Sequence, residues 1–391
     1  MPLDLKRENE IVPQYSLTGD LISYLRCGLQ YRYHNGSSLP PSRPVQLWFG
    51  EFIHGVMEAA YRIRRDTNPT PQFPWPANPK PYRGGAPMNR LPHDIGTIGD
   101  TVENTLRATG KNPRNANVRD SAYRRAELAV NEFGPHLFPL IASAEEKVIG
   151  TRNIPQSQSA SPPRARLYEL HGVIDVLSNI QLTGASETNI IKRAIQNVHP
   201  GLSGQFEVIV DYKGTRRPAT NHSYWNQGDW QVQTYAWLRM RVANSLPVVA
   251  GVLLHINELA PSAEDLVELK REIQQGNTDI APANGTHDYY LLNTWRSGDA
   301  VPDFSQQFRI ARAIRIVPVT QSSQTLATQR FDDVVLKIEG CAIAEAHAGA
   351  IIGHWAPNGD DDTCAACDFR HFCPAPAPRT GQHIVTAPTA P

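Results

Sequence analysis

The segment FEVIVDYKG (206–214) is an apolar, β-branched run that ends with a carboxylate and an ammonium two residues apart. Its composition predicts a mostly buried strand. Because side chains at i and i+2 of a strand share a face, Asp211 and Lys213 are expected to point the same way. Taken alone, such a pair is most often a surface ion pair at a strand end, so its meaning depends on the rest of the chain.

A second strand-like run, YELHGVIDVL (168–177), also carries an acid, Asp175, near its end. Two strand-borne carboxylates and a lysine can hold a divalent cation and a water beside a phosphate. A third run, EEKVIGTR (145–152), begins with two acids, and either Glu145 or Glu146 could supply an additional carboxylate. Together the strand ends predict a candidate metal site.

Composition limits the class of protein. The chain has 391 residues and zero formal net charge, so contact with a polyanion has to rely on local basic patches. Arginine clusters occur at 62–65, 124–125 and 216–217, and each is either a phosphate contact or a solvated face. No apolar stretch is long enough to span a bilayer, and the N-terminus lacks the apolar core of a signal peptide, which predicts a cytoplasmic protein without membrane contact.

Patterning predicts an α/β fold with a mixed sheet. Helical patterns cover about 15–65, with Thr18 as an N-cap, and recur near 98–107, 120–133, 229–244, 266–274, 302–316 and 331–354. A further β-branched run spans 247–257. We expect a tail at 1–14, one domain at 15–373 with insertions near 66–120 and 258–316, and a disordered Pro-rich tail at 374–391.

Two predicted helices carry further polar side chains. In WFGEFIHGVMEAAYR (48–62), His54 lies on the border of an apolar stripe, where an imidazole can reach a neighbouring element. In DWQVQTYAWLRM (229–240), Gln231 and Tyr235 are four residues apart and share a face. Each feature by itself is more typical of packing or hydrogen bonding than of catalysis.

The five cysteines do not form a disulfide pattern. Cys364, Cys367 and Cys373 have the spacing C-x2-C-x5-C, and Cys27 lies near the other end of the chain. In a reducing compartment this arrangement predicts a metal or cluster site. The alternative to a cluster is a zinc site, with Cys27 or a histidine such as His371 as the fourth ligand. Cys341 follows a helical apolar pattern and is expected to be a buried core thiol.

Taken in order, the motifs are Gly50-x3-His54, Gly172-x2-Asp175, Asp211-x-Lys213 and Gln231-x3-Tyr235. This succession resembles the RecB-type branch of the PD-(D/E)XK nuclease superfamily. With the cysteines added, the chain is similar to the iron–sulfur members, which include CRISPR-associated RecB-like exonucleases and the AddB nuclease domain. The resemblance implies a restriction-endonuclease-like core whose N- and C-terminal segments are joined at a [4Fe–4S] cluster held by Cys27, Cys364, Cys367 and Cys373.

The resemblance also implies an activity and a site. It predicts a metal-dependent DNA exonuclease that acts on single-stranded or end-opened DNA in repair or antiviral defence, with a helicase or a CRISPR or other defence protein as partner. His54, Asp175, Asp211 and the Tyr212 carbonyl would bind Mg²⁺ or Mn²⁺, and the imidazole would favour Mn²⁺. Lys213 would orient the attacking water or neutralise the oxyanion, while Gln231 and Tyr235 would place the nucleotide.

Other functions fit parts of the pattern. A non-catalytic, DNA-binding subunit of a helicase or CRISPR-adaptation complex would share the fold, but the presence of Asp175, Asp211 and Lys213 speaks against it. A restriction-type endonuclease would share the sheet and the Asp-x-Lys chemistry. A zinc-stabilised interaction protein would explain only the cysteines. The insertions could form a lid, a DNA guide or a partner surface.

Overall fold

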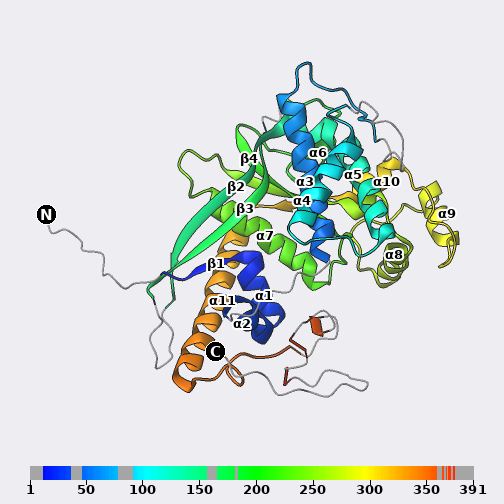
Figure 1. Cartoon of the computed structure of the whole chain (residues 1–391). Coiled ribbons are helices and arrows are strands. Elements are labelled where there is room, and N and C mark those ends of the chain that lie inside the picture. Colours follow the sequence, from blue (N-terminus) through cyan, green and yellow to red (C-terminus); the bar gives the residue numbers. More distant parts are fainter. Residues whose placement is uncertain are drawn as a thin grey trace.

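The chain folds around one six-stranded mixed sheet flanked by helices, which confirms the α/β class (Figure 1). The computed structural model describes residues 12–36, 46–77, 91–155, 165–180 and 184–358, together with 363–364, 367, 369–370 and 373–374. The strands are β1 (Gln14–Ser16), β2 (Ile141–Asn153), β3 (Leu167–Ile180), β4 (Phe206–Lys213), β5 (Val248–His255) and β6 (Ile314–Pro318). They follow the order β1-β3-β4-β5-β6, and β2 pairs with β3 outside this path.

Strand pairing brings the acids of the sequence motifs to one part of the sheet. The β4 and β5 strands are parallel, whereas β3 is antiparallel to both β2 and β4. Val176 of β3 pairs with Val210 of β4, so Asp175 and Asp211 each lie one residue beyond this pair. The two carboxylates therefore meet where β3 and β4 diverge.

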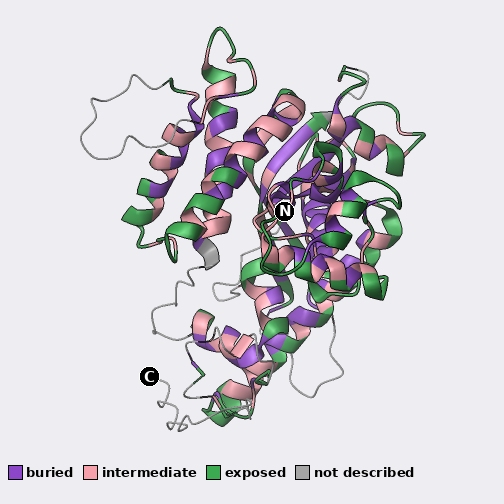
Figure 2. Cartoon of the chain, turned by 90° about the vertical axis from the view of Figure 1, so that its right-hand side faces the viewer, coloured by how far each residue is buried: buried purple, intermediate pink, exposed green. Residues whose placement is uncertain are grey.

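Four helices cover one face of the sheet: α3 (Gln46–Asp66), α4 (Ile95–Ala108), α5 (Ala116–Leu137) and α6 (Ile190–Val198). Ile53, Val56, Met57 and Ala60 of α3 are fully buried against the apolar side chains of β4 and β5, as the predicted stripe requires. Figure 2 shows this buried layer between the sheet and the helices. The packing fixes α3 close to β4, which matters for His54.

The other face carries α7 (Ser223–Arg239) and α11 (Gln321–Ala348), joined by η1 (Leu17–Ile22), α1 (Ser23–Arg26) and α2 (Gly28–Gly36). Phe331 of α11 packs between Trp230 and Trp237 of α7, with ring centroids 5.9 and 5.8 Å away. The beginning and the end of the chain thus lie side by side in one core (Figure 1).

A small helical segment connects β5 to β6. It contains η3 (Ile256–Leu259), α8 (Ala263–Gln275), α9 (His287–Thr294) and α10 (Gln306–Ala313). The apolar cluster of this segment includes Leu266, Leu292 and Trp295. A further short helix, η2 (Phe138–Leu140), lies outside the segment, directly after α5. We call residues 256–313 the β5–β6 segment; it corresponds to the predicted insertion near 258–316.

Several sequence predictions need correction. The first element is a strand, and Ser16 rather than Thr18 caps the helix that follows, because its side chain accepts a hydrogen bond from the Gly19 amide. The predicted helix at 302–316 is α10 followed by β6, since Ile314–Pro318 pairs with β5. The α6 helix, which Asn189 caps, is not among the predicted helices.

Other expectations lie partly beyond the described residues. Of the predicted tails at 1–14 and 374–391, the structure describes only residues 12–14 and 374. His371, the alternative zinc ligand, also lies outside the described residues. The predicted insertion near 66–120 contains α4 and the start of α5. Within the described ranges, no helix is both long and apolar enough to cross a membrane.

Candidate active site

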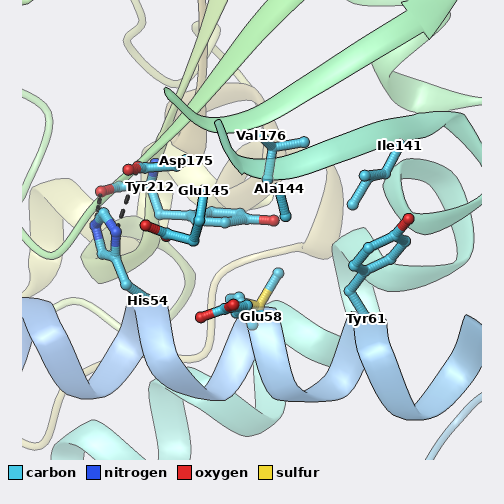
Figure 3. A pocket seen from close by; sticks show the side chains of 10 residues that line it. His54, Glu58, Tyr61, Ile141, Ala144, Glu145, Asp175, Val176 and Tyr212 are labelled. Carbon is cyan, nitrogen blue, oxygen red and sulfur yellow. Dashed lines mark hydrogen bonds and ion pairs between the residues drawn. The ribbon is translucent and has the colours of Figure 1, made fainter. Parts of the chain in front are cut away.

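His54 projects from α3 toward the ends of β3 and β4 (Figure 3). Its Nε2 lies 2.6 Å from the Tyr212 carbonyl oxygen, and its Nδ1 lies 3.3 Å from Asp175 Oδ2. The Tyr212 amide donates to the same carboxylate oxygen at 3.2 Å. A helix, a strand end and a strand backbone therefore converge on one point, as the motif order predicts.

A close backbone approach allows this contact. A Cβ added to Gly214, directly after β4, would lie 3.0 Å from Gly50 Cα and 3.1 Å from the Phe49 ring. Only a residue without a side chain lets the end of β4 come so near α3. Because Gly50 lies one turn before His54, this approach places the imidazole against the Tyr212 carbonyl.

The second motif glycine has a different physical role. A Cβ on Gly172 would lie 2.7 Å from Cε1 of Tyr235, far closer than an ordinary contact. The glycine therefore makes room on β3 for the tyrosine ring of α7, which is buried. Two motifs separated in sequence are thus parts of one packing contact.

Asp211 and Lys213 form an ion pair at the end of β4, with Nζ 2.5 Å from Oδ2. Asp211 is buried, which makes the pair different from a solvated charge pair at a strand end. Lys213 Nζ also donates to Gln231 Oε1 at 2.5 Å, and Gln231 Nε2 donates to the Tyr235 hydroxyl at 3.4 Å. The contacts link the third and fourth motifs through side chains on one face of α7.

Burial and neighbouring charges set the protonation of these groups. Burial alone would lower the pKa of His54, but Asp175, Asp211 and the Tyr212 carbonyl together raise it to about 9. Burial and the neighbouring Asp175 raise the pKa of Asp211 to about 6, against the opposing effect of Lys213. Burial also opposes ionisation of Asp175, but His54 and Lys213 bring its pKa below the ordinary value. At neutral pH the His54 imidazolium and the Lys213 ammonium thus balance the Asp175 and Asp211 carboxylates.

His54, Asp175 and Tyr212 line a pocket that is open to solvent and holds about 240 Å³ of empty space. Two further acids, Glu145 and Glu58, line the same pocket. Glu145 falls opposite Asp175 in the β2–β3 register, and burial, Asp175 and Glu58 raise its pKa. Its φ of 53° is unusual for a residue with a side chain and indicates local strain. Glu146 instead pairs with Arg239 Nη1 at 2.5 Å, so of the two glutamates Glu145 is the one that lines the pocket.

Glu58 was not among the predicted residues. It lies four positions after His54 on α3, so helical spacing could have identified it. Met57 and Tyr61 of the same helix also line the pocket. The pocket is thus polar at the His54 end and apolar at the Tyr61 end (Figure 3).

The donor set suits a hard divalent cation. The carboxylates and the Tyr212 carbonyl offer oxygen ligands. His54 faces the Tyr212 carbonyl with Nε2 at 2.6 Å and Asp175 with Nδ1 at 3.3 Å, so the two contacts use different ring nitrogens. The imidazole would have to give up one of these contacts to bind an ion. Within the described residues, no three His, Cys, Asp or Glu side chains are arranged to hold a metal ion as they stand. Asp211 is directed at Lys213, so it would have to turn to join the set.

The four predicted cluster cysteines line one pocket, although they come from opposite ends of the chain. Cys27 follows α1, and its Sγ accepts hydrogen bonds from the Gln30 and Asn358 amides, both at 3.4 Å. Burial raises the pKa of the Cys367 thiol, and the nearby Cys27 and Cys373 raise it further. The pocket holds about 380 Å³ of empty space beside Tyr33 and Phe369.

Among the described residues the thiols are not arranged to hold an ion as they stand, so a [4Fe–4S] cluster and a zinc ion both stay predictions for this pocket. Cys341 is not part of this pocket. It is half-buried rather than a core thiol, and its Sγ lies 3.5 Å from the Tyr24 hydroxyl.

Comparison with known proteins adds little. No protein-family model matches this chain, and no curated protein matches it. Eight chains among solved structures match. One of them, the crystal structure of SSO0001, is 11% identical over 92% of this chain and 94% of that chain, with a TM-score of 0.26. A similarity at this level carries no argument, so inference about function rests on the geometry described above.

Proposed function

We propose that this chain is a metal-dependent deoxyribonuclease with a restriction-endonuclease-like core, of the RecB-type PD-(D/E)XK group. The observation that carries the proposal is the convergence of four sequence motifs on one end of the sheet. His54 contacts both Asp175 and the Tyr212 carbonyl, and Asp175 accepts a hydrogen bond from the Tyr212 amide. Beside them, Asp211, Lys213, Gln231 and Tyr235 form a connected chain.

In this proposal His54, Asp175, Asp211 and the Tyr212 carbonyl hold Mg²⁺ or Mn²⁺. When bound, the ion lowers the pKa of a water and neutralises charge on the phosphate. Glu145 adds a carboxylate at the pocket wall. Because the pKa of His54 is about 9, the imidazole has to lose a proton before it can act as a ligand at neutral pH.

Lys213 is positioned to act on the reacting phosphate. Of its three N–H donors, Asp211 and Gln231 engage two, which leaves one for a water or a phosphate oxygen. Gln231 and Tyr235 hold the ammonium and the nucleotide in place. Burial raises the pKa of Tyr235, so its hydroxyl remains protonated and able to donate.

The cysteine pocket supports a second part of the proposal. Cys27, Cys364, Cys367 and Cys373 would hold a [4Fe–4S] cluster with a structural role, since they connect the N-terminal helices to the chain end. Free thiols at ligand positions suit a reducing compartment, so we place the reaction in the cytoplasm. Anaerobically purified protein should be brown and contain iron; a colourless protein with one zinc would contradict this part.

The substrate is DNA, either single-stranded or opened at an end. We propose exonucleolytic action in DNA repair or antiviral defence, together with a helicase or a CRISPR or other defence protein. The resemblance of the motifs carries this part. Circular single strands that survive digestion would support an exonuclease, whereas their cleavage would indicate an endonuclease.

Lys213→Ala tests the active site directly. End-labelled DNA, linear and circular, should be incubated with Mg²⁺ or Mn²⁺ and with the parent protein, Lys213→Ala or Lys147→Ala. Lys147 is an exposed lysine of β2 and serves as the matched control. We expect Lys213→Ala to lose at least 100-fold in rate, on the scale of removing one charge-stabilising group, while Lys147→Ala keeps the parent rate. Equal rates for both variants would refute the assignment.

A further inference from the structure

The turn that leaves β4 after Lys213 is held from two sides. On one side, Gly214 packs against Gly50 and Phe49 of α3. On the other side, Arg216 and Arg217 contact the β5–β6 segment. Gly214, Arg216 and Arg217 all lie within four residues of Lys213. The contacts that fix this turn therefore also fix the position of Lys213.

Arg217 is the centre of the second attachment. Its side chain is 3% exposed, so it is neither a solvated surface group nor available to a phosphate. Its Nε donates to Asp279 Oδ1 at 2.8 Å, and Nη2 pairs with the other oxygen of the same carboxylate. Nη1 donates to the carbonyl oxygens of Arg312 and Ile314, each at 2.9 Å. One guanidinium thus joins the turn to the middle of the β5–β6 segment at Asp279 and to its far end at Arg312 and Ile314.

A second buried pair supports this contact. Glu258 of η3 accepts a hydrogen bond from the Arg217 amide at 2.7 Å. The same carboxylate pairs in a bidentate manner with Arg312 of α10, at 2.6 and 2.9 Å. Both side chains are buried, and Arg312 Nη1 also donates to the Ile280 carbonyl at 2.8 Å. The partners therefore have little freedom to move.

The β-sheet register connects the same segment to the lysine. Lys213 of β4 lies beside His255 of β5, and η3 begins at the next residue, Ile256. The segment is therefore attached to the end of β4 through the sheet as well as through Arg217. Lys213 lies between these two attachments.

We propose that Arg217 is a positioning residue of the nuclease site and that the β5–β6 segment is the support on which it acts. Arg217 fixes the turn after β4, and this fixes Lys213 relative to Asp211 and Gln231. The inference rests on the proposed function and excludes a phosphate-binding role for Arg217. It also assigns the segment a role other than that of a lid.

The test compares Arg217→Gln with Arg271→Gln. Arg271 is the matched control because it lies on α8 of the same segment, is exposed, and pairs with Glu268 of its own helix rather than with the turn. Two substrates are used with Mn²⁺: a single-stranded oligonucleotide and bis(p-nitrophenyl) phosphate, a small phosphodiester that cannot contact the segment and the site at once. Rates are measured well below the melting temperature of each variant.

Misplacement of a reacting group by about 1 Å can cost 10²-fold in rate, so we expect Arg217→Gln to lower kcat roughly 10- to 100-fold on both substrates. KM should stay within about twofold, because the segment does not bind substrate in this scheme. Arg271→Gln should keep the parent kcat. A raised KM for DNA alone would overturn the proposal and indicate a DNA guide, and equal losses in both arginine variants would indicate general destabilisation.

Hydrogen exchange separates this inference from the proposed function. In Arg217→Gln, but not in Arg271→Gln, the amides of residues 212–217 should lose protection, whether or not the protein cleaves DNA. If the parent is inactive on both substrates, the proposed function fails and exchange still decides the role of Arg217. If Arg217→Gln does not fold, Asp279→Asn is used in its place. This substitution removes the charge that pairs with Arg217 but keeps the size of the side chain, and Asp279 is one third exposed, so the variant should fold. Unchanged exchange in the folded variant would refute the inference.

Discussion

Gly172→Ala is the most direct test of how the second and fourth motifs pack together. The new Cβ would lie 2.7 Å from Tyr235 Cε1, whereas ordinary contacts begin near 3.4 Å, so the ring would have to move by about 0.7 Å (3.4 − 2.7). Tyr235 is only 7% exposed, so the ring has little free space to move into. Overpacking of this kind costs about 1–3 kcal/mol.

Part of this cost is offset in the unfolded state. Replacing glycine with alanine reduces the freedom of the unfolded chain and contributes about 0.4–1 kcal/mol of stability where the backbone tolerates it. The net loss for Gly172→Ala is then about 0.5–2 kcal/mol in the free energy of unfolding. Urea denaturation of the protein, followed by tryptophan fluorescence, measures it.

Gly340→Ala provides the control for this prediction. Gly340 lies within α11, and a Cβ added there meets no described atom within 4 Å. The same chemical change should therefore stabilise the helix by about 0.5–1 kcal/mol. Opposite signs at the two glycines are the expected result.

A double-mutant cycle identifies the cause. In a Tyr235→Ala background the clash is absent, so Gly172→Ala should become neutral or stabilising, with a coupling energy of about 1–2 kcal/mol. If Gly172→Ala costs the same with and without the tyrosine ring, the packing explanation of this motif is wrong. DNA cleavage should also fall in the single variant, because Tyr235 contacts Gln231 beside Lys213.

Three further predictions concern other regions. Cys27→Ser should lose iron and visible absorbance while Cys341→Ser keeps both, because only Cys27 lines the cysteine pocket; equal iron contents would contradict the assignment. Burial and Arg217 hold the pKa of His255 well below its ordinary value, so the unfolded chain takes up the proton first, and the free energy of unfolding should fall as the pH drops below about 6.5. Urea midpoints should show a smaller fall for His255→Phe. In Gly50→Leu the new Cβ lies where no described atom is within 4 Å, so the free energy of unfolding should stay the same. If a DNA strand passes this position, the leucine side chain should slow DNA cleavage. Cleavage at the parent rate would exclude this path for the DNA.

The sequence predicted the site better than the fold that surrounds it. The order of four motifs, which resembles that of the RecB-type nucleases, singled out the candidate residues His54, Asp175, Asp211, Lys213, Gln231 and Tyr235. Periodicity alone only placed Asp211 with Lys213, and Gln231 with Tyr235, on a shared face. The structure then brings them together as strand pairing and helix spacing require. Metal binding and cleavage themselves remain predictions.

What the sequence did not predict depends on partners distant in the chain. Ile314–Pro318 looked helical because only its pairing with β5 makes it a strand. Arg217 resembled a surface cation because the residues that bury it, Glu258, Asp279 and Arg312, belong to a segment without a recognisable pattern. The strained backbone at Glu145 likewise has no local signal.

The packing of α11 on α7 has a consequence for synthesis of the chain. The last site residue, Tyr235, leaves the ribosome 138 residues before Cys373 (373 − 235), which corresponds to roughly 7–28 s at ordinary elongation rates. Phe331 follows Tyr235 by 96 residues (331 − 235), so Trp230 and Trp237 lack it for roughly the first 5–19 s of this interval, and much of the second core is uncovered. The nascent core therefore exposes aromatic surface to chaperones before the end of the chain arrives to cover it.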